Sequence, residues 1–177
     1  MKKISVLIII FAGMLILPTL ASAQGTGGGS LAVTATIVPT ITLVLDTDGA
    51  GVTLTGTGTN AASLGFGSVS AYAALSSNVG RTVNGVTNYT ISTPFDVKVT
   101  QANSPSLTYT LAAELNAVDG TNTWTIGGVT ITGSAPANVT ATGVYGGDVA
   151  YSLVLTIPFG ETAGLVSNTI NFAATPN

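Results

Sequence analysis

Residues 31–45 read LAVTATIVPTITLVL. Apolar side chains occupy every odd position on both sides of Pro39, and threonine fills most of the positions between them. Strict alternation of this length predicts β-strand with one buried and one wet face. Because Pro39 cannot donate a ladder hydrogen bond, it marks an edge, a kink or a break in the strand.

The same alternation recurs along the rest of the chain between turn signals. Asn84-Gly85 and Gly127-Gly128 both fit tight hairpins. Only residues 70–78 could hold a helical turn. Further strands are predicted at 52–54, 64–69, 89–92, 95–100, 107–115, 124–126, 129–131, 151–157 and 166–174. About nine or ten short strands with no long helix predict an all-β fold, and we expect an antiparallel β-sandwich.

The N-terminus has the layout of a secretory signal peptide. Lys2 and Lys3 precede an apolar run over residues 4–17, and Ala21-Ser22-Ala23 supplies a cleavage pattern. The run is shorter than the roughly 20 apolar residues that a membrane helix needs. We therefore expect a secreted protein, extracellular or at the cell surface, without a membrane span after cleavage.

The sequence predicts three segments. Residues 1–23 are the signal peptide. Residues 24–38 combine a flexible Gly-rich lead with a candidate strand, and residues 39–177 form the β-sandwich domain.

Charge is scarce, at 6% of residues, where roughly 25% is usual. Without Lys2 and Lys3, only Arg81 and Lys98 oppose seven acidic residues, a net charge of −5. Nucleic acid is therefore not expected as a partner, because little neutralises phosphates. Neutral, Thr-rich strand faces are poorly defended against other sheets, which favours self-association.

The residue types restrict the chemistry. The chain has no His and no Cys, which excludes a Ser-His-Asp triad, a Cys nucleophile, disulfides and zinc sites with those ligands. The carboxylates of Asp96 and Glu114 are expected on outward strand faces, with Asp96 near Lys98. Nothing predicts a converging pair, so we expect neither an enzyme nor a cofactor.

Asp46 and Asp48 are a candidate calcium site. The run Asp46-Thr-Asp48-Gly49 resembles half of a calcium loop, but the Glu that closes such loops is absent. The alternative is a turn in which Asp bonds its own backbone.

Two short stretches resemble a known group of bacterial surface proteins. They are Leu64-Gly-Phe-Gly-Ser-Val69 and Gly164-Leu-Val-Ser-Asn-Thr-Ile-Asn-Phe172. Both are similar to elements of the spore coat protein U group and its archaic chaperone–usher pilin-type relatives. The resemblance implies an immunoglobulin-like sandwich and, for the pilins, polymerisation by donor-strand exchange. Unlike those pilins, this chain has no Cys pair.

Residues 31–37 are the candidate assembly strand. Leu31, Val33, Ala35 and Ile37 share one face, behind a flexible lead and before Pro39. Such a segment could be donated to a neighbouring subunit. Alternatively, it begins a long first strand of its own domain, kinked at Pro39.

Taken together, these features predict an extracellular structural subunit. We expect a fimbria- or pilus-like filament, or a surface-matrix protein, that forms a homopolymer by β-strand addition. One alternative is a monomeric secreted module that binds carbohydrate, such as surface glycans, or another ligand. A second is a small outer-membrane β-barrel, although most predicted strands are shorter than the roughly 9–11 residues that this needs.

Overall fold

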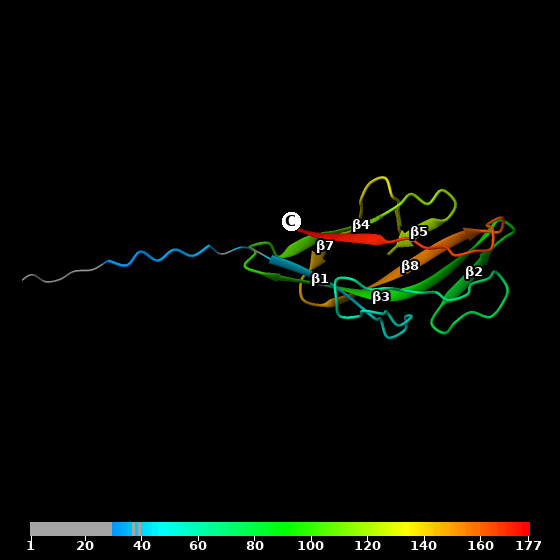
Figure 1. The fold of residues 1–177 in the computed structure, drawn as a ribbon, viewed down its shortest axis with the longest axis horizontal. Helices are drawn as coiled ribbons and strands as arrows, with labels where there is room; N and C mark the ends of the chain where they lie inside the picture. The colour runs from blue at the N-terminus through cyan, green and yellow to red at the C-terminus, as the bar shows by residue number, and fades with distance from the viewer. Residues whose placement is uncertain (1–29, 37, 39) are drawn as a thin grey trace, which may run out of the picture. The chain divides into compact units, whose positions relative to one another are not determined.

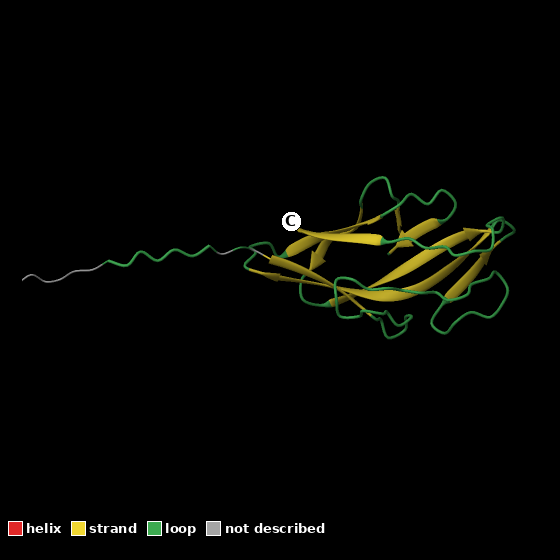
Figure 2. Cartoon of the chain, in the orientation of Figure 1, coloured by secondary structure: helices red, strands yellow, loops and turns green. Residues whose placement is uncertain are grey.

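The computed structural model describes residues 30–36, 38 and 40–177, and there the chain is all-β (Figure 2). The described residues 40–177 belong to one compact unit, and residues 30–36 fall outside it. The strands are β1 (Thr40–Asp46), β2 (Gly80–Asn84), β3 (Asn88–Ala102), β4 (Thr108–Leu115), β5 (Thr123–Ile126), β6 (Val129–Ile131), β7 (Ala137–Val144), β8 (Asp148–Pro158) and β9 (Ile170–Pro176). Within the described residues no helix is long and apolar enough to cross a membrane. The predicted signal peptide, residues 1–23, lies outside them, as does Ile37.

The strands form two antiparallel sheets (Figure 1). The larger sheet has the order β1-β3-β8-β5-β6, with β2 also paired to β3. The smaller sheet has the order β7-β4-β9. The prediction of an all-β antiparallel fold is thus confirmed, with nine strands among the described residues.

One hydrophobic cluster takes side chains from both sheets. Val97 and Val99 of β3 and Tyr109 and Leu111 of β4 are completely buried in it. Along β4, and along β3 as far as Thr100, every second residue is buried and the residues between them are half-buried. The period-two pattern in the sequence therefore reports correctly which face of each strand turns to the core.

Both predicted hairpins form. Gly85 has a φ of 61° in the turn that joins β2 to β3. Gly127 and Gly128, between β5 and β6, have φ values of 57° and 86°. Left-handed conformations at these positions are what a tight hairpin turn requires, and glycine adopts them without strain.

Pro94 does not divide β3, although the sequence predicted two separate strands, one before it and one after it. β3 pairs with β2 as far as Ser92 and with β1 from Asp96 onward. Pro94 falls between these stretches, so its missing N–H interrupts neither ladder. Its partner on β8 is Ser152, which turns its carbonyl to the N–H of Gly127 and therefore needs no bond from Pro94. Gly51 fits against the carbonyl of Pro94, where an added Cβ would lie 2.1 Å from the oxygen.

Three other predictions are wrong. Residues 52–54 and 64–69 form no strand, and the isolated bridge beside them joins Thr55 to Ser63. Leu107, which the alternation assigned to the core, lies before the start of β4 and is exposed. The strand β7 was not predicted, because its sequence ANVTATGV carries few large apolar residues.

Candidate functional site

The two seams between the sheets differ. At one seam β6 leads into β7 through residues 132–136, and the N–H of Leu115 donates to the carbonyl of Thr132 at 2.9 Å. The chain itself therefore closes this seam. At the other seam the edge strands are β1 and β9, the first and last strands in the sequence.

A groove of about 850 Å³ lies at this second seam. Most of its apolar lining comes from half-buried core-facing residues of both edge strands. The loop of residues 58–62 also lines it, and none of the lining residues is charged. The apolar residues from the two strands are Ile41, Leu43, Leu45, Ile170 and Phe172. The groove suits an apolar, uncharged occupant, because a charge placed in it would lose hydration without gaining a partner.

The free edge of β1 faces this groove. The N–H of Leu45 donates to the carbonyl of Thr59 at 2.8 Å, and its carbonyl accepts from the N–H of Gly58 at 2.9 Å. Leu45 therefore directs both backbone groups away from β3. Because this direction alternates along a strand, Leu43 and Ile41 direct theirs the same way. Among residues 30–36, 38 and 40–177, nothing pairs with the backbone of either.

On β9, as on β1, the core-facing residues direct their backbone groups toward the free edge of the sheet. The N–H of Asn116 donates to the carbonyl of Thr169 at 2.8 Å, so Thr169 turns toward the β4 side. By alternation, Ile170, Phe172 and Ala174 turn their backbone groups away from β4. These groups also have no partner in the part of the chain that the structure describes. Both strands thus present core-facing side chains and unpaired backbone groups at the same positions.

The two edges run in opposite directions. β1 begins opposite Ala102, at the end of β3, and β9 ends with Pro176 opposite Tyr109, near the start of β4. Only residues 103–107 separate β3 from β4, so β9 ends where β1 begins (Figure 1).

The candidate assembly residues are exposed. Leu31 and Val33 are 88% and 79% exposed, and Ala35 is exposed as well. Ser30–Thr36 lie outside the nine strands, and β1 starts only at Thr40. Ile37 falls outside the described residues.

The candidate calcium residues Asp46 and Asp48 both accept hydrogen bonds. Oδ1 of Asp48 accepts the N–H of Ala50 at 2.7 Å, which is the predicted Asx turn. Oδ1 of Asp46 accepts the hydroxyl of Thr57 at 3.2 Å. Within the described ranges no group of three or more acidic, His or Cys residues could hold a metal ion.

Lys98 pairs across strands rather than along its own. Its Nζ lies 3.3 Å from Oδ1 of Asp148 on β8, not next to Asp96 as the sequence suggested. Lys98 and Asp148 are register partners, so their side chains project from the same face at the same level. Burial and the carboxylates of Asp48, Asp148 and Asp46 raise the pKa of Asp96.

The sequence predicted the candidate donor segment of this site but not the groove. The alternation in the sequence predicted the segment 31–37 and the core-facing residues of β1 and β9. It could not reveal that these two strands end as facing sheet edges, because that depends on pairing between distant parts of the chain. Comparison with models of known protein families, with curated proteins and with solved structures finds no match to this chain.

Proposed function

We propose that this chain is a secreted structural subunit that polymerises by strand addition. Residues 31–37 of one copy fill the β1–β9 groove of the next. The two sheets are then the faces of an immunoglobulin-like β-sandwich that lacks one strand at this seam. A core shared by both sheets and an open seam between two edge strands support this assignment.

One observation carries the proposal. On both β1 and β9, the residues that face the core are the ones that direct unpaired backbone groups into the seam. In an antiparallel pair, directly opposed residues bond to each other. In a parallel pair, a residue bonds to the neighbours of the residue opposite it. Since β1 and β9 run in opposite directions, one inserted strand is parallel to one edge and antiparallel to the other. Its core-facing residues then bond to one edge and its outward residues to the other, which satisfies both edges.

The segment 31–37 fits such a position in pattern. It has seven residues, as do β1 and β9, and the part of the β1 edge open to it is Thr40–Val44, because Leu45 already bonds to Gly58 and Thr59. Leu31, Val33, Ala35 and Ile37 would enter the groove, and Ala32, Thr34 and Thr36 would face outward. Burying the large apolar side chains contributes on the order of 5–8 kcal/mol before the entropy of association is subtracted. The backbone bonds of a closed seam add to this.

A pair of charge substitutions in the full mature chain tests the proposal. Val33→Asp places a carboxylate on the face that enters the groove, and Thr34→Asp places the same charge on the outward face. We expect Val33→Asp to remain monomeric in sedimentation and to give no filaments by electron microscopy. Thr34→Asp should assemble as the wild type does.

The control separates assembly from folding. Both substitutions lie outside β1–β9, so circular dichroism should show the same β content in both variants. A wild type that stays monomeric at high concentration would refute the proposal. Equal assembly of the two variants would refute it as well.

A further inference from the structure

We infer that Pro39, together with its neighbours Val38 and Thr40, prevents residues 31–37 from filling the groove of their own chain. The inference rests on the proposed strand addition and names the residues that determine which groove the segment enters. Because these three residues forbid the turn back into the same chain, the segment is left for the groove of a second copy.

The sequence places the segment 31–37 directly before its own groove. Only Val38 and Pro39 separate it from Thr40, the first residue of β1, and the edge of β1 is open from Thr40 to Val44. A segment tethered this closely to a binding site has an effective concentration on the order of 1 mM. At roughly micromolar protein concentration it would therefore fill its own groove before that of a neighbour, unless the connection forbids this.

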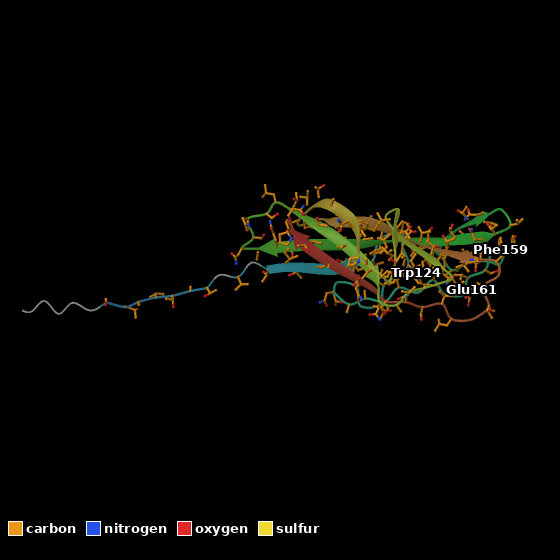
Figure 3. All side chains as sticks on the ribbon, turned by 90° about the horizontal axis from the view of Figure 1, so that it is seen from above. Trp124, Phe159 and Glu161 are labelled. Atoms are coloured by element: carbon orange, nitrogen blue, oxygen red, sulfur yellow. The ribbon has the colours of Figure 1, made fainter. Side chains whose placement is uncertain are left out.

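In its own groove the segment could run only antiparallel to β1. Parallel insertion would place Ile37 beside Val44, which is four residues, or about 13 Å, along β1 from Thr40. The three residue steps from Ile37 to Thr40 span at most about 11 Å. The antiparallel arrangement is a hairpin that enters the seam between β1 and β9, the two strands seen side by side in Figure 1 and Figure 3. It would satisfy both edges as a donated strand does, so the groove itself does not exclude it.

The faces of the two strands fix the length of the hairpin loop. Directly opposed residues of an antiparallel pair lie on the same face of the sheet. A two-residue loop would oppose Ile37 to Thr40, which is exposed, and the apolar face of the segment would then turn to solvent. Pairing Ile37 with Ile41, which lines the groove, leaves a loop of three residues, Val38, Pro39 and Thr40.

All three loop residues conflict with the backbone conformation that this loop requires. A three-residue hairpin loop is typically a type I turn followed by a residue with positive φ. The residue before a proline avoids the right-handed helical region that position 38 would need, and proline is disfavoured at the second turn position. Thr40 is β-branched, so a positive φ there is strained. In the two tight hairpins within residues 40–177, glycine takes the positive φ, at Gly85 and at Gly127 and Gly128.

A longer loop leaves too little of the segment in the groove. The next loop with the same facing has five residues, 36–40, and it removes Ile37 from the strand. Only Ala35 and Val33 would then face the open edge of β1. A donated strand has no such loop, so its register is free to place Ile37 in the groove.

A loop replacement in the full mature chain tests the inference. Val38→Pro, Pro39→Asp and Thr40→Gly together give the sequence Pro-Asp-Gly, which favours the turn that the native residues forbid. We expect this variant to need a protein concentration at least about tenfold higher for assembly, measured by sedimentation. In its monomer the amides of Leu43 and Phe172 should be protected from hydrogen exchange. The matched control is Pro39→Asp alone, which adds the same charge but keeps Thr40, and it should assemble as the wild type does.

A second variant leaves every native residue in place. Gly-Ser-Gly-Ser inserted between Val38 and Pro39 lengthens the connection, so that residues 31–37 can turn back without strain. It should also give monomers in which the same two amides are protected. The same insertion between Ser30 and Leu31 adds equal length on the other side of the segment and should leave assembly unchanged.

Each other outcome has a distinct meaning. If both loop variants assemble at the wild-type concentration while Val33→Asp stays monomeric, the segment is donated but the connection does not choose the acceptor, and the inference is wrong. Monomeric loop variants in which Leu43 and Phe172 exchange rapidly would also overturn it, because their grooves would be empty. A monomeric wild type in which both amides are protected fills its own groove, which overturns the inference together with strand addition.

Discussion

The indole Nε1–H of Trp124 donates to Oδ2 of Asp119 at 2.8 Å. The same carboxylate accepts the backbone N–H groups of Thr121 and Asn122 through Oδ1, at 3.0 and 2.8 Å. Asp119 thus fixes the turn that leads into β5 and holds the only tryptophan of the chain in the core. Asp119 therefore has a structural role.

This arrangement predicts an acid-sensitive contribution to stability. Burial alone would raise the pKa of Asp119. Hydrogen bonds from Asn122, Trp124 and Thr121 lower the pKa by more than burial raises it, so the net shift is downward. A carboxylate with a lowered folded-state pKa stabilises the fold fully above its unfolded pKa of about 3.9. That stabilisation is lost as the pH falls through the folded-state pKa.

Asp119→Ala should therefore lower the free energy of unfolding by about 2 kcal/mol at neutral pH. Urea denaturation across the acid range should show the difference from wild type shrinking below about pH 4. The control is Asp148→Ala, which removes an exposed ion pair and should cost about 0–1 kcal/mol. A difference that is independent of pH would contradict this account of Asp119.

Gly143 should not tolerate a side chain. An added Cβ would lie 2.3 Å from Cζ of Tyr109, whose ring is fully buried. Gly143→Ala must therefore displace Tyr109 or bend β7, and we expect a loss of at least about 2 kcal/mol in urea denaturation. Gly147→Ala is the matched control, because nothing lies within 4 Å of its Cβ. Equal stability of the two variants would show that β7 shifts freely.

Asp96 should behave in the opposite sense to Asp119. Its pKa is raised by burial and by neighbouring carboxylates. A raised folded-state pKa means that the ionised form is disfavoured in the fold, so stability is lost as the pH rises through that value. Asp96→Asn should therefore stabilise the protein at neutral pH and give little gain below about pH 4. Glu114→Gln, on β4, is the control for removing one charge.

The alternation in the sequence predicted β3, β4 and β8 because each has one face in the core and one face in solvent. It failed over residues 52–78, where Leu64 and Phe66 pack on the core without forming a strand. Gly67, with a φ of 71°, turns the backbone there out of the extended conformation. An apolar pattern reports burial, and burial does not require a partner strand.

The candidate site was also predicted only in part. The donor segment could be predicted, because an alternating apolar run behind a Gly-rich lead is a local feature of the sequence. The acceptor groove could not, because its edges, Leu43 and Phe172, meet only after two separate sheets have formed.

Amide hydrogen exchange tests the proposed strand addition most directly. In assembled wild-type protein, the amides of Leu43 and Phe172, on the two free edges, should be strongly protected together with those of residues 31–37. In the monomeric Val33→Asp variant the same amides should exchange rapidly, while core amides such as Val97 remain protected. Rapid exchange at Leu43 and Phe172 in assembled wild-type protein would contradict the account, because no strand would then occupy the groove.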